Sequence, residues 1–186
     1  MLEDLSQHIL DIAENSLNAG AGRVEITVEQ NAEKNRLFLE VADNGHGMDA
    51  ETVVKVLDPF YTTRTTRRVG LGLPFLKQSA ELCGGFLSLQ SKPGEGTTLK
   101  AEFALDCIDR PPLGNIPSTL VTLLAGAPNV RWIYRHVCDG RSFIFDSEEI
   151  VNVLEDPEML RNSEVALWLR DYLRGNIESV EEPPRS

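Results

Sequence analysis

The segment Asp43–Met48, DNGHGM, constrains this chain more than any other because it directly follows a strand-like alternation. Apolar and polar residues alternate over 37–41, which predicts a strand with one apolar face. The carboxylate of Asp43 can only accept hydrogen bonds, and Gly45 and Gly47 let another group approach the backbone closely. The segment therefore predicts either a pocket that receives a hydrogen-bond donor or a simple glycine-rich turn.

Hydrophobic periodicity divides the first hundred residues into helices and strands. Helical spacing covers residues 3–19, 49–57 and 70–82, and alternation covers residues 24–28, 37–41, 86–90 and 98–105. The order is helix, two strands, helix, loop, helix, two strands. We therefore expect an α+β fold, a two-layer α/β sandwich whose mixed sheet carries its helices on one face.

A second region follows the segment DRPPLG, and residues 108–115 are expected to be a linker between a domain at 1–107 and a small α/β region at 116–175. Asp139-Gly140 between alternating residues predicts a hairpin in that region. Trp132, Tyr134 and His136 share one strand face, which suits an interface with a partner or with the first domain. The alternative is that the region only covers a sheet edge or a hydrophobic face. Residues 176–186 are expected to be a disordered tail.

Charge and composition narrow the function classes. The chain has 18 basic and 29 acidic residues and a net charge of −11, so nucleic acid is not an expected partner. It has no secretory signal and no apolar run of about 18 residues, so we expect a cytoplasmic protein with no membrane contact. Cys83, Cys107 and Cys138 form no CxxC pair and are expected to be three reduced, partly buried thiols.

The first predicted helix carries polar residues along one side, namely Gln7, His8, Asp11, Glu14, Asn15 and Asn18. One interpretation is a solvated helix face. The other is that Asp11 and Asn15, one turn apart, point together into a pocket.

A second glycine-rich segment, VGLGL, opens the helix that ends near residue 82. The free N–H groups at a helix start favour phosphate. The loop before it carries Arg64, Arg67 and Arg68, a local excess of positive charge on an acidic chain. These residues fit a phosphate clamp better than a solvated loop. Asp43 would then accept the exocyclic amine of adenine, where guanine presents an oxygen that a carboxylate repels.

The order of these segments resembles the N, G1, F, G2 and G3 boxes of the GHKL superfamily, whose ATP-binding fold is called the Bergerat fold. The matching segments are NSLNAGA, DNGHGM, DPFYTTR, GLGL and GEGTT, and the resemblance covers residues 1 to about 105. NSLNAGA resembles MutL, and PFYTTR with GLGL resembles bacterial sensor histidine kinases. The DRPPLG linker resembles that of short proteins associated with iron-only hydrogenase gene clusters.

The resemblance implies ATP and Mg²⁺ as cofactors. Asn15 would be the magnesium ligand, and Asp11 would be the catalytic carboxylate that orients water. Asp43 would recognise adenine, and the segment 61–72 would be the ATP lid. The residues implied to bind the nucleotide are Asn15, Asn18, Asp43, Gly45, Gly47, Met48, Phe60, Tyr61, Thr62, Thr63, Arg64, Arg68, Gly70, Leu71, Gly72, Leu73, Thr97 and Thr98.

Two departures bear on the reaction. Asp11 stands where ATPases of the superfamily have Glu, which weakens the case for water activation, and the short lid disfavours large dimer closure. None of the three histidines has the context of a phosphoacceptor. We therefore expect a kinase that binds Mg-ATP and phosphorylates a separate, unidentified protein. The alternative is a nucleotide-dependent switch module, or a regulator resembling anti-sigma-factor kinases, without histidine phosphotransfer. The oligomeric state stays open.

Overall fold

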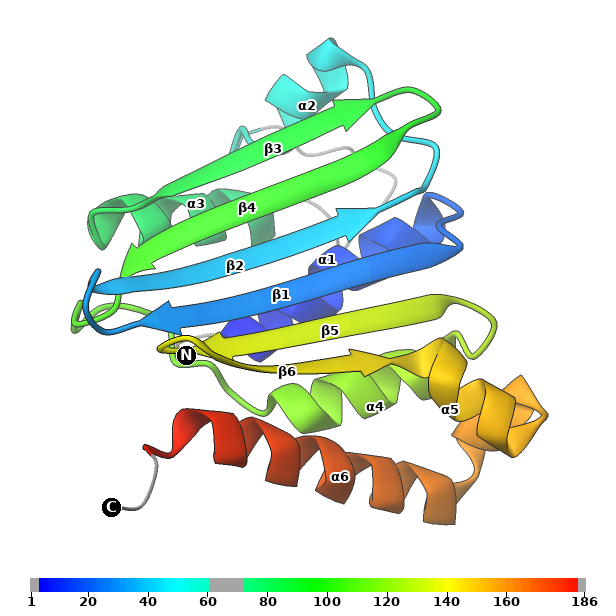
Figure 1. Cartoon of the computed structure of the whole chain (residues 1–186). Coiled ribbons are helices and arrows are strands. Elements are labelled where there is room, and N and C mark those ends of the chain that lie inside the picture. The colour runs from blue at the N-terminus through cyan, green and yellow to red at the C-terminus, as the bar shows by residue number, and fades with distance from the viewer. Residues whose placement is uncertain (1–3, 61–71, 184–186) are drawn as a thin grey trace.

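The computed structural model describes residues 4–60 and 72–183 (Figure 1). The helices are α1 (Leu5–Asn18), α2 (Ala50–Val56), α3 (Gly72–Leu82), α4 (Ile116–Gly126), α5 (Ser147–Leu154), α6 (Ser163–Glu181) and the 3₁₀ helix η1 (Pro157–Arg161). The strands are β1 (Arg23–Asn31), β2 (Arg36–Asp43), β3 (Phe86–Lys92), β4 (Gly96–Ala104), β5 (Arg131–Cys138) and β6 (Arg141–Asp146).

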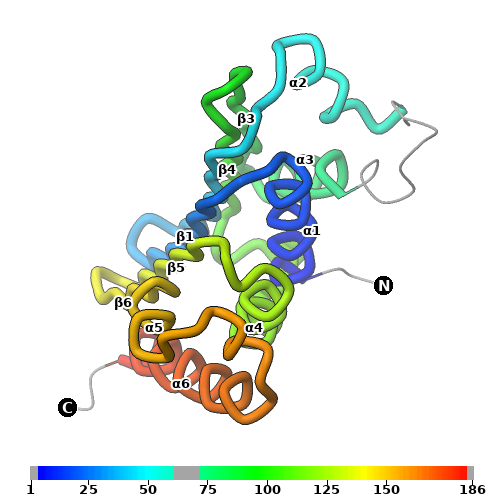
Figure 2. Tube along the Cα trace, turned by 90° about the vertical axis from the view of Figure 1, so that its right-hand side faces the viewer, coloured from blue at the N-terminus to red at the C-terminus, as the bar shows by residue number. Residues whose placement is uncertain are grey.

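The strands form one six-stranded sheet in the order β3-β4-β2-β1-β5-β6. β1 pairs in parallel with β5, and the other neighbouring pairs are antiparallel. Figure 2 shows α1, α3 and α4 on the same side of this sheet. The expected α+β sandwich with a mixed sheet and helices on one face is therefore confirmed.

The start of α1 is fixed by a side-chain cap. Asp4 is its N-cap, and its carboxylate accepts a hydrogen bond from the Gln7 N–H at 3.0 Å. Leu5, Ile9 and Ala13 lie one turn apart and are almost fully buried against the sheet. This apolar stripe fixes the rotation of α1 and directs its other side away from the core.

The C-terminal region has no sheet of its own, because β5 continues the sheet of the first hundred residues at the edge of β1. Trp132, Tyr134 and His136 are at most 2% exposed. This strand face was expected to suit an interface with a partner or with the first domain. It is not open to a partner, because it packs inside the chain where α6 covers β5. The region thus covers a sheet edge, which was the alternative interpretation.

The end of the chain also differs from expectation, because α6 continues to Glu181. The segment 176–186 was expected to be disordered, but Ile177 and Val180 are buried in this helix. The sequence ESVEEPPRS looks unstructured by composition, yet these two apolar residues extend the stripe of Leu169 and Leu173 at helical spacing.

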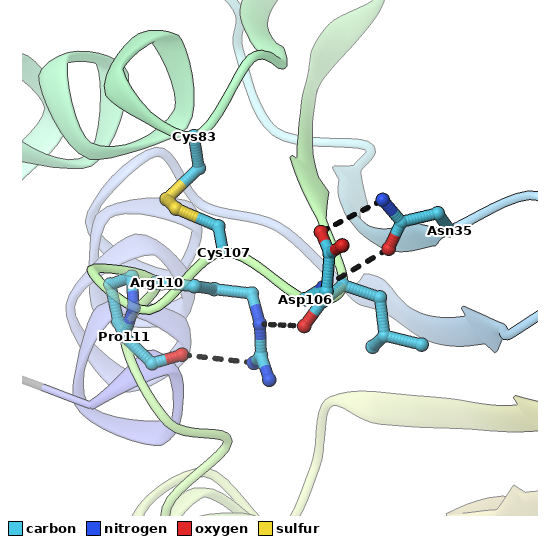
Figure 3. Close-up of a disulfide and its surroundings, with 7 residues drawn as sticks. Asn35, Cys83, Asp106, Cys107, Arg110 and Pro111 are labelled. Atoms are coloured by element: carbon cyan, nitrogen blue, oxygen red, sulfur yellow. Dashed lines mark hydrogen bonds between the residues drawn. A yellow bond between two sulfur atoms is a disulfide. The ribbon is translucent and has the colours of Figure 1, made fainter.

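Two of the three cysteines are paired, contrary to the expectation of three reduced thiols. Cys83 and Cys107 form a disulfide with 5.5 Å between their Cα atoms (Figure 3). Cys138 is a buried free thiol. The cause is the β3–β4 hairpin. β3 begins just after Cys83, and β4 runs back antiparallel, so the residues after β4 return to the end of α3.

Within residues 4–60 and 72–183, no helix combines the length and the apolar composition needed to cross a bilayer.

Candidate functional site

A cavity of about 430 Å³ lies between α1, the loop after β2, and the sheet. Val41, Leu89 and Leu99 line it from the sheet, Ile12 lines it from α1, and Ala19 lines it from the C-cap of that helix. Among residues 4–60 and 72–183, polar side chains reach it at a few points, namely Asn15, Ser16, Asn18, Asp43, His46 and Thr97. An apolar slot with a few convergent polar groups is the usual form of a small-molecule site.

Asp43 lies at the end of β2 and is held in one orientation. Its Oδ2 accepts a hydrogen bond from the Ser16 hydroxyl at 2.6 Å, and its Oδ1 accepts one from the Gly45 N–H at 2.8 Å. Each carboxylate oxygen has a further lone pair. The group can therefore accept a hydrogen bond from a ligand without giving up either protein contact.

The loop after Asp43 is fitted tightly between α1 and the β3–β4 turn. The His46 N–H donates to the Ala19 carbonyl at 2.8 Å, and the Gly94 N–H donates to the His46 carbonyl at 2.7 Å. A Cβ on Gly47 would lie 1.9 Å from the Lys92 carbonyl oxygen, and Gly47 has a φ of +70°. Glycine is therefore needed there for the protein's own packing as well as for the approach of a ligand.

A hydroxyl network supports the far side of the cavity. Ser91 Oγ lies 2.8 Å from Thr97 Oγ1 and accepts a hydrogen bond from the Met48 N–H at 2.8 Å. Thr97 is paired with Asp43 across β4 and β2, so the two polar side chains stand next to each other. Thr98 is not among the lining residues, because strand alternation directs it to the opposite face of the sheet.

The first helix presents only part of its polar side to the cavity. Asn15 and Asn18, which were expected to bind the nucleotide, both line the cavity. Asp11 is exposed and does not line it, and a Cβ on Gly72 would lie 3.7 Å from its Oδ2, which places Asp11 beside the start of α3. His8 is only 4% exposed, so the solvated interpretation fails for that residue.

The remaining predicted residues divide into two groups. Leu73 lines the cavity from α3, whereas Gly45, Phe60 and Gly72 are not among its lining residues, and Phe60 is 92% exposed. Tyr61, Thr62, Thr63, Arg64, Arg68, Gly70 and Leu71 lie outside the described residues.

Ser16 and Ser91 were missed by the sequence reasoning. Ser16 lies in the predicted NSLNAGA segment and follows Asn15 directly, so its position was a usable signal. Ser91 lies in an ordinary strand, and its role depends on the turn that brings it to Met48.

In the described parts of the chain, no three His, Cys, Asp or Glu side chains lie close enough to hold a metal ion. Asn15, which lines the cavity, carries a side-chain oxygen of the kind that hard cations such as magnesium take together with water and phosphate oxygens.

Comparison with known proteins assigns the part of the chain that forms the cavity to a protein family. The family model described as Histidine kinase-, DNA gyrase B-, and HSP90-like ATPase matches residues 2–106. All residues that line the cavity lie inside this range.

Several curated sensor kinases are similar to this part of the chain. The sensor protein kinase FleS of Pseudomonas aeruginosa is 39% identical over 108 residues, which are 58% of this chain and 26% of FleS. The sensor protein kinase WalK of Staphylococcus haemolyticus is 36% identical over 95 residues, 48% of this chain and 16% of WalK. The sensor histidine kinase YxdK of Bacillus subtilis is 31% identical over 99 residues, 50% of this chain and 30% of YxdK. The chain spans less than a third of each of these relatives.

A solved structure, the N-terminal domain of a DNA repair protein, is similar in fold with a TM-score of 0.51 and 17% identity. The similarity covers 76% of this chain and 51% of that one.

Proposed function

Because this chain belongs to the histidine kinase-, DNA gyrase B- and HSP90-like ATPase family, whose ATP-binding, kinase-like domain it carries, we propose that it binds Mg-ATP and phosphorylates a separate protein. The observation that carries the proposal is the fixed carboxylate of Asp43 at the end of an apolar slot. The shape and polarity of this slot suit a purine base.

Adenine is the base that suits the slot. Its exocyclic amine would donate to Asp43, and Val41, Leu89 and Leu99 would contact the ring. Guanine would place a carbonyl oxygen against the same carboxylate, and two acceptors repel each other. The selectivity for adenine over guanine that we propose therefore follows from whether the base presents a donor or an acceptor to Asp43.

The phosphates would extend from the base toward Asn15 and the start of α3. The Asn15 side-chain oxygen would hold Mg²⁺, which neutralises charge on the phosphate oxygens. The N-terminus of α3 lies beside Asp11. The N–H groups at this helix start would favour a phosphate bound in front of α3. The arginines of the predicted lid would add positive charge, as the sequence suggests.

The phosphate acceptor in this proposal is a residue of another protein. His8 and His136 are buried, and His46, although exposed, lines the proposed nucleotide cavity, so we propose that a separate protein supplies the acceptor. Asp11 is exposed beside the start of α3, where the phosphates would lie, and we propose that it faces the hydroxyl or imidazole of a bound partner. Phosphoryl transfer depends mainly on positioning and charge stabilisation, and a bound acceptor would supply the missing positioning. We place this reaction in the cytoplasm, where ATP is available.

A second function, a nucleotide-dependent switch, is favoured by one contact. The N–H groups of Leu5 and Ser6, at the start of α1, donate to the carbonyls of Pro112 and Leu113 at 2.8 and 2.9 Å. The helix that carries Asn15 is therefore attached to the C-terminal region. Occupation of the cavity could be transmitted to a partner along this path without phosphate transfer.

Two measurements test the proposal. Calorimetry with Mg-ATP should show binding, and ATP labelled at its γ-phosphate should label a protein in native lysate. Asn15→Ala should abolish both the binding signal and the labelling. Acid treatment of the labelled product identifies the acceptor, because phosphohistidine is acid-labile and phosphoserine is not. Binding without any labelled protein would favour the switch. Absence of Mg-ATP binding by folded protein would overturn both functions.

A further inference from the structure

The disulfide between Cys83 and Cys107 joins the end of α3, a helix that reaches the cavity, to the segment that precedes α4. Cys83 directly follows α3, and Cys107 begins the segment that leads to α4 (Figure 3). The bond lies at the end of α3 that is remote from the cavity, while Leu73 lines the cavity from the other end of that helix.

The Cys107 side of the bond is connected to the first helix. Arg110 holds the intervening segment in a compact turn, because its Nε donates to the Leu105 carbonyl at 3.2 Å and its Nη1 donates to the Pro111 carbonyl at 3.1 Å (Figure 3). The next two carbonyls, of Pro112 and Leu113, then accept the N–H groups at the start of α1.

The fit at this junction is close. A Cβ on Gly114 would lie 2.2 Å from Asp4 Cγ and 2.5 Å from Ser6 Oγ, so the segment is seated directly on the start of α1. The Thr119 hydroxyl of α4 adds a hydrogen bond to the Ser6 carbonyl at 3.3 Å. Helices α1 and α3, which both line the cavity, are thus joined at their remote ends through one covalent bond and this segment.

We propose that the Cys83–Cys107 disulfide is a redox-controlled tether, reduced by a dithiol, that sets the affinity of the cavity for its nucleotide. The proposal rests on the proposed nucleotide site. Disulfides in proteins of reducing compartments are usually transient and regulatory, which agrees with such a role.

The reaction is a thiol–disulfide exchange with a dithiol reductant. Cys107 is half-buried and Cys83 is 3% exposed, so a thiolate of the reductant attacks the sulfur of Cys107. The bond between the two protein sulfurs breaks, Cys83 leaves as a thiolate, and a mixed disulfide forms at Cys107. The second thiol of the reductant then displaces Cys107. Two electrons pass to the protein, both cysteines become thiols after protonation, and the reductant becomes a disulfide.

Reduction should loosen α3 more than the sheet. The Cys83 carbonyl accepts a hydrogen bond from the Ala104 N–H at 2.9 Å. Reduction leaves this bond in place, so the end of α3 stays attached to the end of β4. What is lost is the covalent link from α3 to the segment seated on α1. We expect Mg-ATP to bind about fivefold more weakly after reduction, at the lower end of usual coupling between sites.

The experiment compares oxidised protein with protein treated with dithiothreitol. Alkylation and mass spectrometry in denaturant confirm the state, with Cys138 alone labelled before reduction and all three cysteines labelled after it. Calorimetry measures the Mg-ATP affinity, and amide hydrogen exchange measures protection at Leu5, Ser6 and α3. Cys107→Ser should show weak binding and no response to reductant. Cys138→Ser is the matched control and should respond as the wild type does.

The two proposals fail in different ways. Unchanged affinity after confirmed reduction, or a response that persists in Cys107→Ser, would overturn the tether and leave the nucleotide site intact. If neither redox state binds Mg-ATP, the proposed function fails, and the claim that the tether sets affinity fails with it. In that case, exchange at Leu5 and Ser6 shows separately whether the mechanical link exists. Faster exchange after reduction would support the link, and unchanged exchange would overturn it.

Discussion

Replacing Asp43 with Asn tests the base-binding end of the cavity with almost no change in shape. In Asp43→Asn, the side-chain oxygen would keep the hydrogen bond from the Gly45 N–H, because that backbone donor needs an acceptor. The new amide group then faces Ser16, whose hydroxyl can accept from it and still donate to the Ile12 carbonyl at 3.3 Å. The variant should therefore fold normally.

The cost falls on the ligand. The wild-type carboxylate accepts from the exocyclic amine of adenine, whereas the variant presents a donor to that amine. Loss of a hydrogen bond to a charged group costs about 1.5–3 kcal/mol, which weakens binding about ten- to hundredfold. Guanine has an oxygen at the same position, so the variant should lose much less affinity for GTP or gain some.

Calorimetry with Mg-ATP and Mg-GTP measures both affinities, and circular dichroism checks the fold. Asp139→Asn is a matched control, because Asp139 lies in the turn between β5 and β6 at a φ of +47°, which Asn tolerates well. It should bind both nucleotides as the wild type does. If folded Asp43→Asn retains wild-type affinity for ATP within about threefold, Asp43 is not the adenine acceptor and this reasoning is wrong.

Three further predictions follow from other residues. Asn15→Ala should lose magnesium-dependent ATP binding in calorimetry while its unfolding free energy changes by about 0.5 kcal/mol or less, since Asn15 lies at the cavity rather than in the core; a collapsed dichroism spectrum would contradict this. The pKa of Glu181 lies below its ordinary value of 4.5, mainly because His136 donates a hydrogen bond to the carboxylate. The resulting stabilisation is present above the ordinary pKa and is lost as pH falls through the folded pKa, so Glu181→Gln should flatten the acid side of a denaturation series by less than about 1 kcal/mol; an unchanged profile would count against it. Truncation at Pro111 should give aggregated protein in size-exclusion chromatography, because it removes β5 from the edge of β1, and a soluble monomer would refute that expectation.

Local signals in the sequence were sufficient for the N-terminal half of the fold. Alternation over 37–41 correctly indicated β2, because strand period and burial agree on one face of the sheet. The position of Asp43 followed from its place directly after that strand. Six further residues that the sequence reasoning assigned to nucleotide binding line the cavity, namely Asn15, Asn18, Gly47, Met48, Leu73 and Thr97, and their contact with a nucleotide stays a prediction.

The features that the sequence reasoning missed depend on contacts between distant segments. The pairing of β5 with β1 joins residues more than a hundred positions apart, and no local pattern specifies which edge a strand will join. The disulfide was missed because the cysteines were judged by their spacing alone, although the β3–β4 hairpin returns the chain to the end of α3. Thr98 was included with Thr97 because the side of β4 that faces the cavity was not assigned.

The C-terminal region belongs to the same folded unit as the cavity, although the family model ends at residue 106. β5 occupies the edge of β1, and Leu120 and Leu124 of α4 are buried in the same core as Leu5. The segment before α4 also receives the first two N–H groups of α1, which would otherwise need water or another acceptor. The rotation and position of α1 therefore depend on residues outside the matched range. Since Asn15 and Ser16 lie on α1 and line the cavity, the geometry of the cavity also depends on these residues beyond position 106.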